Sequence, residues 1–307
     1  MADDAPRPSL PRLAWQAFGT FRAHQMTDNA AALTYYAMLS LFPALLMVVS
    51  LLGLFGAADL ATRAANYVID HGADQATADT VRNVLRKVTE SSGAKAGISF
   101  VLATVLALNG ASGAFGAAGR ALNKVHAVDE DRGLVRRKAT DLAATLVVIV
   151  LFIVVLVSLF LGGQVAHDLF GTIGLGSAAA SVWSIVRWPV AFVAALLAYA
   201  LIYAFAPDVD PRRIRWITPG SVAGVLIWLV ASGLFGVYIK NFSSYGAAYG
   251  AFGAAIVLLL WLYLSATAFL FGAELDTVIE RSGTAGRGGP PMVTPPPPHP
   301  SDAGSSG

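Results

Sequence analysis

Long stretches without a charged residue constrain this chain more than any other feature. The first extends from Ala30 to Ala58, and others of more than twenty residues recur further along the chain. A helix of about 20 apolar residues crosses the hydrocarbon core of a bilayer. In that core the backbone must satisfy its own hydrogen bonds, which a helix does within one segment. The sequence therefore predicts several membrane-spanning helices.

Composition agrees with a membrane protein and excludes several kinds of site. Charged residues make up 13% of the 307 residues and hydrophobic residues 56%, whereas soluble domains have about 25% charged residues. The chain has no cysteine, so disulfides, thiolate nucleophiles and Cys-based metal sites are excluded. The five histidines show no metal-ligand spacing. We expect neither a metal ion nor a cofactor.

The distribution of apolar residues predicts an all-α, polytopic membrane protein, a bundle of about six transmembrane helices. The spans are expected near residues 35–56, 97–119, 142–163, 184–206, 217–239 and 250–273. They form one transmembrane domain, residues 31–281, after a cytoplasmic N-terminal segment, residues 1–30. Residues 282–307 are rich in glycine and proline and are expected to be a disordered tail.

The first loop has a different pattern. Between residues 59 and 96, Val81, Val84, Leu85 and Val88 follow helical spacing, while basic side chains occupy other faces. This pattern predicts an amphipathic extramembrane helix in the first outer loop, which caps the bundle or lies in the membrane interface.

The distribution of Lys and Arg predicts the orientation. With six spans and a cytoplasmic N-terminus, fourteen of the 21 basic residues fall inside, and five of the other seven lie in the long first loop. The positive-inside rule then places both termini in the cytoplasm. The acidic, proline-bearing N-terminus lacks the basic start and short apolar stretch of a signal peptide, so we expect the first span to be retained.

Three segments resemble the YihY/BrkB family of membrane proteins, formerly labelled ribonuclease BN. They are ALTYYAMLSLFPALL (32–46), ITPGSVAGVLIW (217–228) and YGAAYGAFGAAIVLLLWLYLSATAFLFGAEL (245–275). Together with the order of six helices, the resemblance covers about residues 10–281. It implies a multi-pass protein of the bacterial inner (cytoplasmic) membrane and a transport function, with lipid-like molecules among the proposed substrates.

The residues themselves argue against an enzyme. A ribonuclease needs clustered carboxylates with a metal, or a nucleophile with its base. Here the acidic residues are scattered over loops and tails, and the phosphate-binding motif G-x-x-x-x-G-K-[ST] is absent. We therefore predict no catalytic residue, no metal site, no direct use of ATP and no nucleic-acid partner.

Seven side chains within the spans are candidates for a substrate pathway. They are Tyr35, Tyr36, Ser40, Pro43, Asn109, Trp228 and Trp261. Pro43 removes one backbone donor, so we expect a kink there, with the freed carbonyl of Leu39 satisfied by Ser40. Asn109, near the middle of a span, is expected to find a hydrogen-bond partner. Interface anchoring, an interhelical hydrogen bond and aromatic packing are the alternative roles.

Three charged residues are candidates at the rims of the bundle. Arg120 and Glu274 fall at a similar depth near the inner ends of their spans, so we expect them to pair, either as a structural salt bridge or as part of a gate. Arg187, near Trp183 and Trp188 at the outer side, either extends to the interface or binds an anionic head group.

Two functions from different classes fit these features. The first is a transporter or flippase-like exporter of an amphipathic or lipid-like compound, motivated by the resemblance, the kinked first span and the polar and aromatic residues at mid-membrane depth. The second is a structural or regulatory membrane scaffold without transport activity, assembled through small-residue faces. Membrane lipids are the expected partners, and a homo-oligomer is left open.

Overall fold

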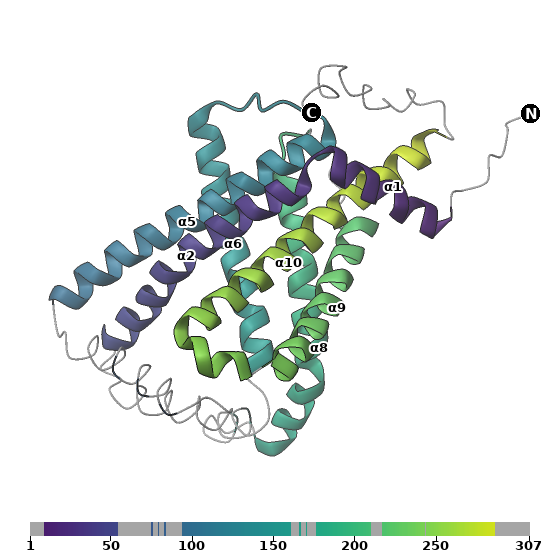
Figure 1. Cartoon of the computed structure of the whole chain (residues 1–307). Coiled ribbons are helices and arrows are strands. Elements are labelled where there is room, and N and C mark those ends of the chain that lie inside the picture. The colour runs from purple at the N-terminus through teal and green to yellow at the C-terminus, as the bar shows by residue number, and fades with distance from the viewer. Residues whose placement is uncertain are drawn as a thin grey trace, which may run out of the picture.

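The computed structural model describes residues 9–54, 75, 79, 83, 94–160, 166, 170, 176–209, 217–242 and 244–285, and all regular structure within them is helical. The helices are α1 (Leu10–Ala23), α2 (Met26–Leu54), α5 (Ala94–His126), α6 (Leu134–Phe160), α8 (Gly176–Phe205), α9 (Pro219–Phe242) and α10 (Ser244–Ala285), as Figure 1 shows. The predicted amphipathic helix within 59–96 lies almost wholly outside the described residues, as does the tail after residue 285.

Five of the described helices are long and apolar enough to cross a membrane. Their apolar parts are Phe100–His126, Leu134–Ser158, Ala178–Phe205, Pro219–Ile239 and Ala255–Ser282. They correspond to the second to sixth predicted spans and confirm a polytopic all-α membrane protein. Helix α2, at the position of the first predicted span, is 29 residues long but is not among the five. The total of six spans therefore stays a prediction.

Several helices extend beyond the predicted spans. Helix α5 continues to His126 where the span was expected to end at 119, α6 begins at Leu134 ahead of 142, and α10 continues to Ala285 past 273. The added residues include Ala, Leu, Arg, Lys and Glu, which are good helix formers. Hydropathy locates the apolar part of a helix, whereas the helix itself continues into the charged region beside the membrane.

Helix α1 lies within the N-terminal segment, for which the sequence analysis predicts no helix. Leu13, Ala17 and Phe21 follow at helical spacing and are buried. Leu13 and Ala17 pack against Val278 of α10. The chain then turns into α2 through Gln25, whose φ of 54° lies in the left-handed region. The apolar face of α1 thus fixes the beginning of α2 against α10.

The long helices pack in pairs around α10. Helices α2 and α5 run side by side, as do α6 and α8, and α9 and α10 (Figure 1). Helix α10 also contacts α1, α2 and α5. It is therefore the element on which most of the described bundle assembles.

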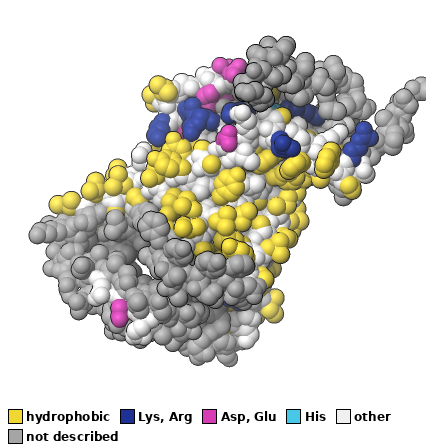
Figure 2. Space-filling model, viewed as in Figure 1, with side chains coloured by type: hydrophobic (Ala, Val, Ile, Leu, Met, Phe, Trp, Pro, Cys, Tyr) yellow, Lys and Arg dark blue, Asp and Glu magenta, His cyan; other side chains and the backbone are white. Residues whose placement is uncertain are grey.

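Burial is concentrated in the half of the bundle next to α1 and the end of α10, here named the packed half. The main core cluster lies there and consists of Phe21, Met26, Ala30, Phe115, Ala118, Ala121, Leu122, Val125, Ala144, Ala206, Phe269, Leu270 and Ala273. Figure 2 shows that Lys, Arg, Asp and Glu gather at this end and that a hydrophobic surface follows below it.

In the opposite half, here named the loose half, α5 and α10 bury few of their described side chains, although α6, α8 and α9 form a second, smaller core cluster around Val155, Leu196 and Val225. Between residues 97 and 110, α5 buries only Ala103 and Ala107 among them. Between residues 255 and 267, α10 buries none. The same two helices are almost continuously buried one to three turns further on, so tightness of packing changes along each helix.

Glycines allow α9 and α10 to approach closely in the packed half. A Cβ added at Gly220 would lie 2.3 Å from Cβ of Asp276 and 2.4 Å from the carbonyl oxygen of Gly272. A Cβ at Gly272 would in turn lie 2.8 Å from Cα of Gly224. Small residues at such crossings let helix backbones pack against each other in a membrane.

We expect Gly220→Ala to lower the thermal midpoint of the protein in detergent, because the new methyl group overlaps the backbone of α10. Overpacking of this kind costs about 1 to 3 kcal/mol. Gly233→Ala, on the same helix, is the matched control, since nothing lies within 4 Å of a Cβ there. Equal midpoints for the two variants would contradict the close crossing.

Candidate functional site

Buried polar side chains gather in the packed half. Among the described residues, three carboxylates are almost fully enclosed, namely Asp141 on α6 and Glu274 and Asp276 on α10. A charge near hydrocarbon is unfavourable unless it is paired or hydrogen-bonded. The partners of these side chains therefore define the polar architecture of this end of the bundle.

Glu274 pairs with a histidine at the junction of α1 and α2. Nδ1 of His24 lies 2.6 Å from Oε1 of Glu274. The Glu274 side chain is 1% exposed and that of His24 28% exposed. His24 is the C-terminal cap residue of α1, so this contact joins the α1–α2 junction to α10.

The predicted pair between Arg120 and Glu274 is wrong. Arg120 is exposed on α5, and the Glu274 carboxylate contacts His24. A Cβ placed on Gly116 would lie 3.7 Å from Nη1 of Arg120, so the Arg120 side chain lies back along α5. Matching depth along two helices does not determine which faces they present to each other.

Asp276 caps the N-terminus of α9. The backbone N–H of Gly220 donates to Oδ1 of Asp276 at 3.1 Å. Thr218 and Ser221 complete the cap, because each side-chain oxygen accepts a hydrogen bond from the backbone N–H of the other, both at 3.1 Å. Pro219 begins the helix, where its missing donor does no harm. A carboxylate at this end also compensates the positive end of the helix dipole.

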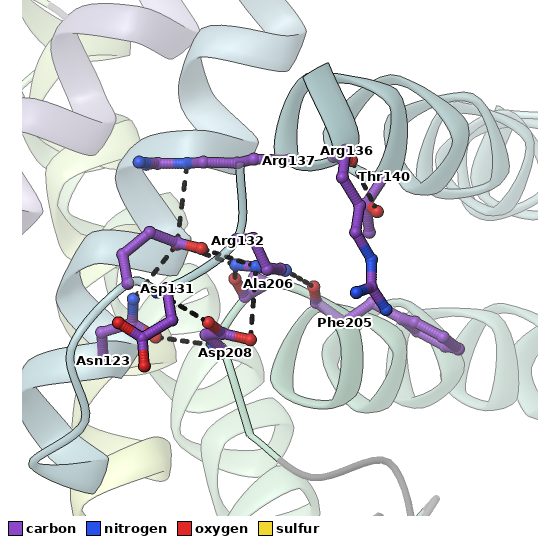
Figure 3. A network of polar contacts seen from close by, with 10 residues as sticks. Asn123, Asp131, Arg132, Arg136, Arg137, Thr140, Phe205, Ala206 and Asp208 are labelled. Atoms are coloured by element: carbon purple, nitrogen blue, oxygen red, sulfur yellow. Dashed lines mark hydrogen bonds and ion pairs between the residues drawn. The ribbon is translucent and has the colours of Figure 1, made fainter. Parts of the chain in front are cut away.

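A second polar network joins the loop after α5 to the end of α8 (Figure 3). Arg132 donates from Nε to Oε1 of Glu130 at 2.6 Å, and from Nη2 to the carbonyl oxygen of Ala206 at 2.9 Å. The backbone N–H of Asp208 donates to Oδ1 of Asn123 at 2.8 Å. The Arg132 guanidinium thus satisfies a free carbonyl at the C-terminus of α8.

The charges in this network lie outside the apolar spans, and they stabilise each other. The hydrogen bond from Arg132 lowers the pKa of the Glu130 carboxyl below its ordinary value of 4.5, and the charges of Arg132 and Arg137 act in the same direction. The same contact raises the pKa of Arg132. The pair is therefore ionised at neutral pH.

Trp228 and Trp261 pack against each other between α9 and α10. Nε1 of Trp228 donates to Oγ of Ser265 at 3.0 Å, and Nε1 of Trp261 donates to Oγ of Ser232 at 3.2 Å. The ring centroids are 6.4 Å apart. Both polar edges are satisfied, which supports the packing role, while a role in a substrate pathway stays a prediction.

Two of the four candidates on α2 lie at its contact with α5. Tyr36 lies against Gly113 and Ser40 against Gly110, at positions where a Cβ would come within 3 Å. Tyr35 is exposed and meets Tyr36 edge to face. Pro43 lies inside α2 as expected. The Ser40 hydroxyl donates to the carbonyl oxygen of Ala37 at 2.8 Å, in place of the expected contact with Leu39.

The surroundings of Asn109 differ from what was expected for an amide near the middle of a span. Its side chain is exposed on α5 in the loose half, and it has no hydrogen bond to another described residue. The physical reason is that this part of α5 packs against α2 on one face only, where Ala103 and Ala107 are buried.

Arg187 lies in the loose half, on α8. Its guanidinium carbon is 5.0 Å from the ring centroid of Trp188. The ring of Trp183 meets that of Phe170 edge to face at 6.4 Å. Nε of Arg187 is buried and has no hydrogen-bond partner.

Comparison with known proteins identifies the family. A family model described as virulence factor BrkB matches residues 17–295. The chain belongs to this family. The match includes every described helix from α2 to α10 and the C-terminal half of α1.

Curated relatives of this BrkB family chain are bacterial. YfkH of Bacillus subtilis, whose name describes it as ribonuclease-like, is 27% identical over 266 residues, 87% of this chain and 94% of the relative. A UPF0761 membrane protein of Alteromonas mediterranea is 28% identical over 265 residues, 84% of this chain and 85% of the relative. One from Xanthomonas campestris is 27% identical over 287 residues, 90% of this chain and 61% of the relative. No solved structure matches.

The polar contacts of this BrkB family member include residues that sequence reasoning missed. His24, Asp276 and Arg132 were not among the candidates, although Asp276 follows Glu274 by two positions and both lie at the end of a long apolar stretch. That spacing was the available signal for Asp276. Among the described residues, no group of three or more His, Asp or Glu side chains is arranged to hold a metal ion.

We expect His24→Ala and Glu274→Ala each to lower the thermal midpoint in detergent. Removing either partner leaves the other without its contact, which costs about 2 to 3 kcal/mol here, since His24 is partly exposed. The double substitution should be less harmful than the sum of the two. Arg120→Ala is the control and should have little effect, and additive losses for His24 and Glu274 would contradict their coupling.

The Glu130 contact should make stability depend on pH. Because its folded pKa lies below 4.5, its contribution is fully present above about pH 4.5 and is lost as the pH falls through the folded pKa. Glu130→Gln should lower stability at pH 7 by about 1 kcal/mol and flatten the acid limb of a midpoint-against-pH curve. Asp131→Asn, an exposed neighbour, serves as control, and identical curves for wild type and Glu130→Gln would refute the contribution.

Proposed function

We propose that the protein moves an amphipathic or lipid-like compound across a bacterial cytoplasmic membrane, with both of its termini in the cytoplasm. The observation that carries the proposal is the contrast between the two halves of the bundle. The packed half is closed by a continuous core, the His24–Glu274 contact and the Glu130–Arg132 network. The loose half has none of these contacts among its described residues, and its segments of α5 and α10 have few buried side chains.

The chemistry of the loose half suits a molecule with apolar and polar parts. Its described surface is mainly Val, Leu and Ile, interrupted by the exposed amide of Asn109 and the guanidinium of Arg187. Trp228 and Trp261 are half-buried beside this surface. An amphipathic compound could bury its chains on the aliphatic side chains and place its polar group against the amide or the guanidinium.

The scaffold alternative has less support. It was based on small-residue faces that would be free to pack against partner helices and on the outer amphipathic helix, which lies almost wholly outside the described residues. Within the chain the small residues of α5 are already occupied, because Gly110 and Gly113 lie against α2, Gly116 faces Asp141, and Gly119 faces the carbonyl of Ala206. The small-residue face therefore holds the monomer together.

The proposal is tested by reconstituting the purified protein into liposomes that carry fluorescent lipid analogues in one leaflet. We expect the rate of leaflet exchange to rise with the amount of protein, and Gly220→Ala to reduce it because the α9–α10 crossing is disturbed. Liposomes with an unrelated six-span protein are the control. Exchange no faster than in that control, over a panel of zwitterionic, anionic and single-chain lipids, would refute the proposal.

A further inference from the structure

We propose that Arg187 binds the phosphate group of an anionic amphiphile in the loose half of the bundle. This inference deepens the proposed function, on which it rests, by naming the chemical class of the compound. Arg187 lies eighteen positions before Phe205, the last residue of α8. This spacing places Arg187 about 27 Å along the helix from the packed end. With cytoplasmic termini, that depth corresponds to the outer leaflet.

Among the described residues, no carboxylate pairs with Arg187. None of the ion pairs among the described residues involves it, and its buried Nε lacks a hydrogen bond. Three charged residues of the packed half, in contrast, have partners. Glu274 contacts His24, and Asp276 accepts a hydrogen bond from a backbone N–H. Arg132 donates to one carboxylate and to two carbonyl oxygens. A guanidinium inside a span, near aliphatic side chains, is stabilised by an anionic partner, and a lipid phosphate is the partner that we assign to Arg187.

The geometry holds the guanidinium in place. It lies over the ring of Trp188 at 5.0 Å, a cation–π distance. An arginine that only extends into the head-group region would expose its whole guanidinium to water, whereas Nε here is buried. Stacking on an aromatic face leaves the in-plane N–H groups of Nη1 and Nη2 at the edge of the stack, and such a pair of donors matches two oxygens of a phosphate.

The surroundings favour a lipid as the source of the phosphate. The neighbours Ile185, Val186 and Trp188 are exposed, and exposed aliphatic and aromatic side chains at this depth contact acyl chains. Pro189 follows two residues later and lacks the backbone N–H that would bond the carbonyl of Ile185. The position therefore combines a fixed cation, an apolar contact surface and a local break in the helix hydrogen bonds.

The test measures thermal stabilisation of the full chain in a neutral detergent by added phosphatidylglycerol, with phosphatidylcholine of the same acyl chains for comparison. We expect phosphatidylglycerol to raise the midpoint of the wild type. In Arg187→Gln the concentration for half-maximal stabilisation should rise about tenfold, the loss expected for a charge-assisted hydrogen bond. Arg187→Lys should fall between, because ammonium lacks the planar fork, and Trp188→Ala should also weaken binding.

The matched control is Arg22→Gln, which removes an exposed arginine from α1 at the opposite end of the bundle. It should leave the lipid response unchanged. Equal responses of wild type and Arg187→Gln, or no preference of the wild type for phosphatidylglycerol, would overturn the proposal. Glycerol 3-phosphate added alone distinguishes the source, since equal stabilisation by this soluble anion would overturn the assignment to a lipid.

The leaflet-exchange assay separates this inference from the proposed function. If anionic lipid exchanges about tenfold faster in wild type than in Arg187→Gln, both are supported. If lipids exchange at the same rate in both proteins, the head-group site is wrong and transport stands. If phosphatidylglycerol stabilises the wild type in an Arg187-dependent way and no lipid exchanges, the site stands and transport is wrong.

Discussion

The described bundle depends on one short stretch of α10, from Gly272 to Asp276. Gly272 permits the backbone of α9 to approach, Glu274 holds the α1–α2 junction through His24, and Asp276 caps the first turn of α9. A membrane offers little hydrophobic gain from helix association, so helices are joined by close packing and by polar contacts. This stretch supplies both within about one turn, which explains why α10 is central.

The existence and order of the long helices could be predicted because hydropathy responds to the same constraint that the bilayer imposes on the backbone. Their ends could not, since α5, α6 and α10 continue into charged residues that form good helices but carry no hydropathy signal. Helix α1 could not be predicted from hydropathy, because its buried face consists of only three residues, Leu13, Ala17 and Phe21, within a polar segment.

The polar contacts were harder to predict than the helices. Glu274 was recognised from its position in an apolar helix. Its partner, His24, is 250 residues away, and the sequence around this histidine does not indicate that it forms a buried contact. Arg120 has the right depth and charge but lies on another face of α5, a property fixed by the glycine contacts of that helix with α6 and α8. Depth can be counted along a sequence, whereas the rotation of a helix about its axis depends on packing.

The asymmetry between the halves has a consequence for any transport cycle. To separate the helices in the packed half, the protein must break the His24–Glu274 contact, the Arg132 contacts with Glu130 and Ala206, and the α9 cap, each of which leaves a polar group to be satisfied again. Separation of the described helices in the loose half breaks the two Trp–Ser hydrogen bonds between α9 and α10. Otherwise it replaces side-chain contacts by lipid contacts, which differ little in free energy because acyl chains are as apolar as leucine. In the transport that we propose, the loose half is therefore the easier end to open, and the compound would meet Asn109 and Arg187 before the polar contacts of the packed half.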